Sequence, residues 1–195
     1  MDYSITAQSG NSYTHMWDVA STREFEGGFL FDKTTIPSTV TVLPKSALLK
    51  VDQTERKATL IKTAELYEAI TALSTTVKIK KNSLLLATDV IGTSDIAVTV
   101  GTIDSSNADY DSFTIVADTF GALDAGTVFQ TYDAAGASGK SAVNPDGLNY
   151  ADVSLDANPT CSVIYEAKGV VPSALYQPLT SAIKTALKFC QFLTV

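Results

Sequence analysis

The chain has 195 residues, of which 45 % are hydrophobic and 18 % are charged, and its formal net charge is -7 at pH 7. A chain of this length and hydrophobicity can bury the core of a single domain, which excludes the class of intrinsically disordered proteins. The acidic balance argues against a nucleic-acid partner, because phosphates are bound by clustered Lys and Arg. The apolar runs are far shorter than the roughly 18 residues that cross a bilayer, so no membrane partner is expected.

Residues 1–35 form a polar stretch that carries aromatic side chains and is interrupted by glycines. The sequence GGFLFD within it predicts a short strand rather than a linker. Two interpretations are open: the rings close the edge of the domain core, or the stretch is an extended arm that contacts another subunit. Under the second interpretation the predicted interface residues are Trp17, Phe25, Phe29 and Phe31.

Residues 36–52 alternate β-branched and polar side chains up to Pro44 and then resume as a second apolar run. This pattern predicts two strands with a turn or an edge at Pro44, which cannot donate a backbone hydrogen bond. The next segment, residues 57–73, fits either short helical turns or a strand by its residues alone.

Residues 75–92 predict a β-hairpin. In the first half, Val77 and Ile79 alternate with lysines, which is typical of a strand with one face in a core and one in water. Residues 81–83, Lys-Asn-Ser, suit a turn, and the apolar run 84–91 is expected to be the return strand.

Residues 93–133 contain three further alternating segments, IAVTVGTI, FTIVAD and TVFQTYD, separated by Gly, Asn and Asp. Short strands at this spacing are typical of an antiparallel barrel or sandwich. The stretch 134–158 is rich in small and polar residues and is expected to be a long loop with a small strand at VSL.

The last part of the chain predicts a strand over residues 161–171 and a helix over about 173–190, along which apolar residues recur with a period of 3.6. Cys161 and Cys190 each have apolar neighbours. Free buried thiols are the favoured interpretation for a protein made in a reducing cytosol, and a disulfide is the alternative.

The residues give no signal for catalysis, for a cofactor or for zinc, because His15 is the single histidine and no CxxC or HExxH spacing occurs. One loop gathers the oxygen ligands that Ca²⁺ prefers, at Asn107, Asp109 and Asp111. Counted from Asn107, however, the sixth position is Ser112 rather than glycine, and a strand pattern follows. A solvated hairpin loop is therefore favoured over a weak calcium site.

Four segments of the chain, taken in order, carry a resemblance to a known family: LLKVDQTERKATLIKTAELYEA, VKIKKNSLLLATDVIG, IDSSNADYDSFTI with GALDAGTVF, and VVPSALYQPLTSAIKTALKFCQFLTV. Their order resembles head fiber or capsid decoration proteins of tailed phages and prophages of gut bacteria, of the kind found in Bacteroides phages. The resemblance implies an extended conformation for residues 57–73. Similar sequences carry glycine before the Asp of the return strand, whereas this chain has Thr88 before Asp89.

The expected fold is mainly β, an antiparallel barrel or sandwich over residues 36–195, with the C-terminal helix packed on it and residues 1–35 as an extended arm. The resemblance implies a virion structural protein that is not an enzyme: a capsid decoration or head fiber subunit on the outer surface of an icosahedral phage head. Such a protein is assembled in the host bacterial cytoplasm. The implied partners are the major capsid protein and further copies of the chain, as a dimer or trimer.

The alternative function is a non-catalytic binding module of a phage fiber. In this interpretation the polar loops at residues 134–158 or 105–111 recognise a receptor or a glycan.

Deletion of residues 1–35 distinguishes an arm from a core-closing stretch. If the stretch is an arm, the truncated protein stays folded and loses binding to its partner. If the rings close the core, the truncated protein loses several kcal/mol of folding free energy and melts at a sharply lower temperature. A thermal melt beside a capsid-binding assay measures both outcomes.

Overall fold

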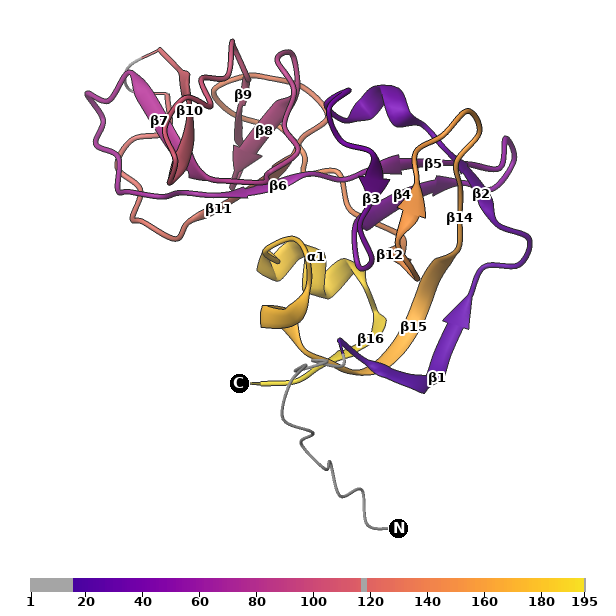
Figure 1. Cartoon of the computed structure of the whole chain (residues 1–195). Helices are drawn as coiled ribbons and strands as arrows, with labels where there is room; N and C mark the ends of the chain where they lie inside the picture. The colour runs from indigo at the N-terminus through magenta and orange to yellow at the C-terminus, as the bar shows by residue number, and fades with distance from the viewer. Residues whose placement is uncertain (1–15, 117–118, 195) are drawn as a thin grey trace, which may run out of the picture.

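The computed structural model describes residues 16–116 and 119–194. Over these residues the protein is mainly β, as expected, and Figure 1 shows two lobes side by side. The large lobe comes from both ends of the chain, residues 16–61 and 143–194, and the small lobe is an insertion, residues 62–142. Within the described residues no helix is long and apolar enough to span a bilayer.

The strands of the large lobe are β1 (Asp18–Glu24), β2 (Phe29–Phe31), β3 (Val42–Leu43), β4 (Leu48–Asp52), β5 (Lys57–Leu60), β12 (Gly147–Asn149), β13 (Val153–Ser154), β14 (Thr160–Cys161), β15 (Val163–Val170) and β16 (Phe189–Phe192). Its helical segments are η1 (Lys33–Thr35), η2 (Pro172–Ala174) and α1 (Ser181–Ala186). The strands of the small lobe are β6 (Thr63–Glu65), β7 (Thr76–Lys80), β8 (Val90–Thr93), β9 (Ile96–Thr99), β10 (Tyr110–Thr114) and β11 (Val128–Thr131).

One curled sheet of eight strands organises the large lobe, in the order β1-β15-β12-β4-β5-β2-β14 with β16 beside β15. Successive side chains of a strand point to opposite faces, so Leu48 and Ile164 enter one core while Leu49 and Val163 enter the other. Both faces of the sheet are therefore apolar, and both need a cover.

The C-terminal segment covers one face. Ile183 and Leu187 of this segment are 0 % and 2 % exposed and pack with Trp17 against Leu48 and Ile164. The opposite face is closed by the small β3–β13 pair and by Leu84, which comes from the small lobe.

The predicted helix over residues 173–190 is wrong in extent, since only Ser181–Ala186 are α-helical. Thr180 begins the helix by accepting a hydrogen bond from the Ile183 N–H, at 3.1 Å. The chain then leaves the helix at Leu187 and joins the sheet as β16, parallel to β15. The apolar stripe was real, but α1 and β16 share it, because Ile183 and Cys190 reach the same core.

The small lobe contains a second sheet, β6-β11-β8-β9, and the separate pair β7–β10. Phe113 of β10 and Phe129 of β11 are 2 % and 0 % exposed and lie in one core between them. Residues 57–73 contain β5 and β6 and no helix, so the extended interpretation of this segment is confirmed.

The predicted hairpin over residues 75–92 is wrong. β7 pairs with β10 along its whole length, and β8 pairs with β9 and β11. Between them the run 84–86 is a loop, in which Leu84 has a φ of 59° and packs in the large-lobe core. Leu85 packs instead in the small-lobe core, so this loop joins the two lobes. An apolar run does not by itself reveal that its members belong to two cores.

Thr88 follows in the same loop with a φ of 83°, a left-handed conformation that β-branched residues rarely adopt. Glycine adopts such a φ without strain, so Thr88 is held there by the contacts of the loop.

A buried ion pair lies within the small lobe, at the crossing between the lobes. Lys62, at the crossing between the lobes, is 3 % exposed, and its Nζ lies 2.5 Å from Oδ2 of Asp89. Burial lowers the pKa of Lys62, and the hydrogen bond to Asp89 opposes that shift. Asp89 also accepts a hydrogen bond from the Leu86 N–H, at 2.6 Å, which fixes the loop that carries Leu84.

Two further expectations need correction or extension. The stretch 134–158 is not one long loop, because β12 lies within it, buried in the large sheet between β4 and β15, while β13 is the small strand expected at VSL. A strand of three residues with one large apolar side chain, Leu148, gives little sequence signal. The described part of the expected arm, residues 16–35, supplies β1 and β2 to the same sheet. Residues 1–15 lie outside the described residues.

Leu84→Ala is expected to destabilise the protein by about 2–5 kcal/mol, because it leaves a cavity in the core of a lobe to which the loop does not otherwise belong. The matched control is Leu73→Ala, at a leucine that is 85 % exposed, and its effect should stay within about 0.5 kcal/mol. Chemical denaturation measures both values. Equal effects of the two substitutions would contradict the packing of Leu84 in the core of the large lobe.

Candidate functional site

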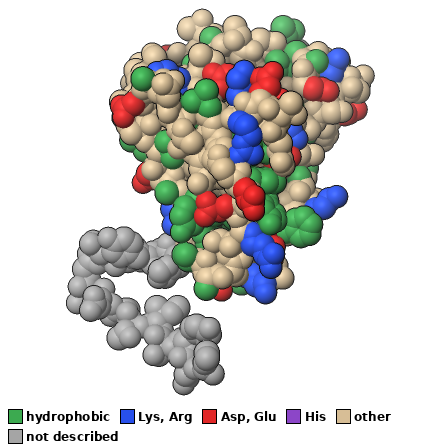
Figure 2. Space-filling model, turned by 90° about the vertical axis from the view of Figure 1, so that its right-hand side faces the viewer, with side chains coloured by type: hydrophobic (Ala, Val, Ile, Leu, Met, Phe, Trp, Pro, Cys, Tyr) green, Lys and Arg blue, Asp and Glu red, His purple; other side chains and the backbone are tan. Residues whose placement is uncertain are grey.

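A hollow of about 520 Å³ on the large lobe is bordered by three aromatic residues, and we call it the aromatic groove. It is lined by Phe25, Lys50, Val51, Gln53, Pro145, Asp146, Tyr165, Ala186, Leu187, Lys188 and Phe189. Figure 2 shows hydrophobic side chains with acidic and basic ones beside them on the lower part of the face that it draws.

The three rings come from three neighbouring segments of the sheet. Tyr165 lies on β15, Phe189 on β16, and Phe25 directly after β1, held there by the bond from its N–H to the Val163 carbonyl at 3.0 Å. The Tyr165 ring centroid lies 4.9 Å from that of Phe25 and 6.5 Å from that of Phe189. Phe25 continues inward to the buried Phe29 ring, at 6.0 Å, so the groove rests on the core.

Phe189 is the exceptional member of this group. It is 63 % exposed, although a phenylalanine gains about 1.5–3 kcal/mol by full burial. Its neighbour Cys190 points to the opposite face and is 7 % exposed in the core beneath α1. The alternation of β16 therefore forces Phe189 outward.

Paired charges surround the rings. Lys50 Nζ lies 2.9 Å from Asp146 Oδ1, and the other oxygen of Asp146 accepts a hydrogen bond from the Val51 N–H. Arg23 Nε lies 3.3 Å from Glu166 Oε2, a pair that joins β1 to β15 without lining the groove. An apolar centre with a charged rim is the composition of protein–protein interfaces.

The predicted interface residues divide into two groups. Trp17, Phe29 and Phe31 are 2 %, 1 % and 2 % exposed within the chain itself, which accords with the core-closing interpretation of residues 16–35. Phe25 is partly buried and keeps ring surface in the aromatic groove. Contact of these four rings with a partner stays a prediction.

Sequence reasoning missed Tyr165 and Phe189. Phe189 falls within the predicted helix. In the tail KFCQF the apolar Phe189 and Cys190 are adjacent, so the residues do not alternate with the period of a strand and give no strand signal. Nothing in the sequence indicates that β15 and β16 are neighbours.

Two of the three calcium candidates accept hydrogen bonds within the chain. Asp111 is 9 % exposed, and its carboxylate accepts a hydrogen bond from Lys81 Nζ at 2.7 Å. The side chain of Asn107 accepts from the Asp109 N–H at 2.9 Å, as in a solvated turn. No cluster of three metal-ligating side chains occurs among the described residues, a set that leaves out His15 and Asp118.

Comparison of the chain with protein-family models, with curated proteins and with solved structures found no match.

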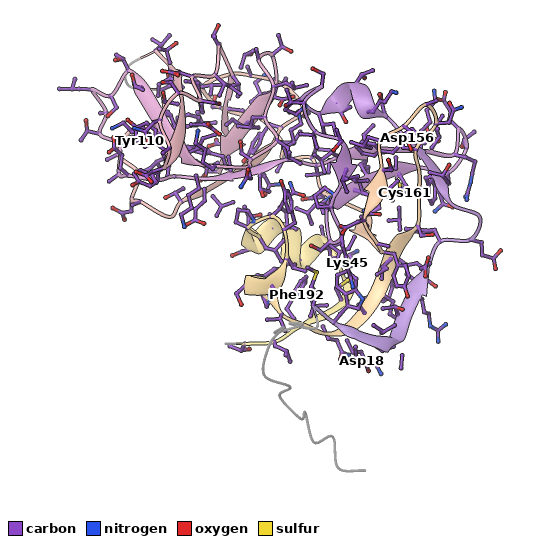
Figure 3. All side chains as sticks on the ribbon, viewed as in Figure 1. Asp18, Lys45, Tyr110, Asp156, Cys161 and Phe192 are labelled. Carbon is purple, nitrogen blue, oxygen red and sulfur yellow. The ribbon has the colours of Figure 1, made fainter. Side chains whose placement is uncertain are left out.

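The two cysteines are free and buried, as predicted, and Figure 3 shows Cys161 within the large lobe. Burial raises the pKa of each thiol from 9.0 to about 11. At pH 8 such a thiol is only about 0.1 % thiolate, which is the reactive form.

We therefore expect the folded protein to react with a disulfide reagent such as DTNB far more slowly than the protein unfolded in guanidinium. In the unfolded protein both thiols are exposed and should react at once. Below pH 11 the rate of the folded protein should rise with pH, since each unit adds about tenfold more thiolate. Stoichiometric labelling of the native protein within seconds at pH 8 would contradict this burial.

Proposed function

We propose that the chain is a structural subunit, not an enzyme, that binds another protein through the aromatic groove. The observation that carries this proposal is the exposed Phe189 ring beside Tyr165 and Phe25, above a buried core. Interfaces use such rings as anchors, because a rigid aromatic side chain buries a large area at a low entropic cost.

The surroundings of the groove support a protein as its partner. The hollow of about 520 Å³ lies open at the surface and is lined by the Lys50–Asp146 ion pair. Charges that are paired within the chain can stay hydrated at the rim of an interface, while the rings at its centre lose water.

The partner that we propose is the major capsid protein, which the resemblance implies. The chain then acts as a decoration or head fiber subunit on the outside of an icosahedral phage head, together with further copies of itself. The closing segment of the resemblance, residues 170–195, supplies Phe189 as well as α1. The aromatic groove is thus built in part from a segment that carries the resemblance.

The polar loops named for the alternative function receive less support. Residues 134–158 contain the buried strand β12, and residues 105–111 are tied down by the bonds of Lys81 to Asp111 and to the Ser105 carbonyl.

Phe189→Ser is the test of this proposal. Binding of the variant to phage heads that lack the protein should weaken by about tenfold or more, the factor that corresponds to about 1.4 kcal/mol. Folding stability should change by no more than about 1 kcal/mol, because Phe189 is already mostly exposed. Mass spectrometry of sedimented heads measures the binding, and a thermal melt checks the fold.

Leu193→Ser is the matched control. Leu193 lies four residues further along the same segment, is 50 % exposed and does not line the aromatic groove. This variant should bind heads like the wild type. Wild-type binding by Phe189→Ser, or absence of any binding by the wild type, would overturn the proposal.

A further inference from the structure

A second hollow, of about 360 Å³, lies between the two lobes, and we call it the inter-lobe groove. One wall comes from β6 and from residues 80–83 of the small lobe, and the other wall from residues 172–178 of the large lobe. This volume lies in the range of about 300–1,000 Å³ that is usual for ligand sites, and such sites occur preferentially where two parts of a protein meet.

Tyr176 forms an aromatic wall of this groove, and its position is fixed at both ends. Its backbone N–H donates to Ser46 Oγ at 2.8 Å, and its hydroxyl donates to the Asn82 carbonyl at 3.2 Å. Burial raises the pKa of Tyr176, so the hydroxyl stays protonated at neutral pH and keeps this bond. The ring is nevertheless 36 % exposed.

The polar groups of the groove include both hydrogen-bond donors and acceptors, and its charged side chains are paired within the chain. Lys80 Nζ and Glu65 Oε1 lie 2.6 Å apart. Lys81, which also lines the groove, lies 2.7 Å from Asp111 Oδ1, so each charge has a partner of opposite sign. The hydroxyls of Ser83 and Ser173 line the groove, and the structure shows no hydrogen bond from either to another described residue.

We propose that the inter-lobe groove binds a neutral saccharide. A sugar ring presents an apolar C–H face and hydroxyls that both donate and accept. The Tyr176 ring can pack against the C–H face of the sugar. The hydroxyls of Ser83 and Ser173, together with the Glu65–Lys80 pair, can exchange hydrogen bonds with the sugar hydroxyls. A charged ligand fits less well, because it would compete with an ion pair that is already formed.

This site shares no residue with the aromatic groove, so the inference does not depend on the proposed function. It gives the alternative function, glycan recognition, a location that neither of the polar loops provides.

The experiment is saturation-transfer NMR of the full chain with maltotriose, cellotriose and chitotriose, and with sialyllactose as the charged comparison. Saturable binding of at least one neutral sugar, stronger than that of sialyllactose, is the expected result. No saturable binding to any neutral sugar of this set, or a preference for sialyllactose, overturns the proposal.

Three variants locate the site. Tyr176→Ala should weaken the affinity for the sugar by about tenfold or more. Ser173→Leu fills the mouth of the groove while leaving both hydrogen bonds of Tyr176 in place, and should weaken binding equally. Tyr67→Ala is the control, since Tyr67 is 43 % exposed and lies outside the groove, and it should leave binding unchanged.

A thermal melt separates loss of the site from loss of the fold, because the bond from the Tyr176 hydroxyl to the Asn82 carbonyl also joins the lobes. If Tyr176→Ala unfolds the protein, Ser173→Leu alone decides. Wild-type affinity in Ser173→Leu, or an equal loss in Tyr67→Ala, would place the sugar elsewhere and overturn the assignment.

Discussion

The buried side-chain amide of Gln177 ties the C-terminal segment to the large sheet and to the crossing between the lobes, and the position of that segment depends on this tie. Its Oε1 accepts a hydrogen bond from the Leu48 N–H of β4 at 2.9 Å, and its Nε2 donates to the Ile61 carbonyl at 2.8 Å, where the chain leaves the large lobe. A buried amide without these partners would cost roughly 1–3 kcal/mol, so the bonds select one position for the C-terminal segment. That position places Tyr176 against the small lobe and starts α1 over the face of the sheet that it covers.

The small lobe is inserted between β5 and β12, so the two ends of the insertion must lie close together. Two strands far apart in the sequence, β4 and β12, pair in the large sheet, and the inserted residues must leave and return close to one another. The pairing of β6 with β11 meets this need at the crossing. Leu84 then packs in the core of the large lobe, and the Lys62–Asp89 pair positions the loop that carries Leu84. A buried ion pair adds little net stability, because desolvation offsets its attraction, but it favours one arrangement.

Both proposed surfaces depend on the same C-terminal segment. Residues 172–178 form a wall of the inter-lobe groove, and residues 186–189 line the aromatic groove. The helix α1 between them is anchored in the core by Ile183, which is 0 % exposed. Aromatic residues flank this anchored helix, Tyr176 before it and Phe189 after it. The helix can therefore hold the two proposed binding surfaces in a fixed relation to each other.

The sequence by itself determined the β-rich class, the turn at Pro44, the strand of Val77 and Ile79, and the burial of both cysteines, because these follow from local periodicity and composition. It did not determine which strands pair. β7 joins β10 rather than β8, and the tail leaves its helix to become β16, since pairing depends on the cores that distant residues build. The aromatic groove is the clearest case: only the tertiary structure makes the tail a strand, which turns Phe189 outward and brings it to Tyr165 and Phe25. Hydrophobic periodicity specifies which face of a segment is buried and carries no information about the neighbour that covers it.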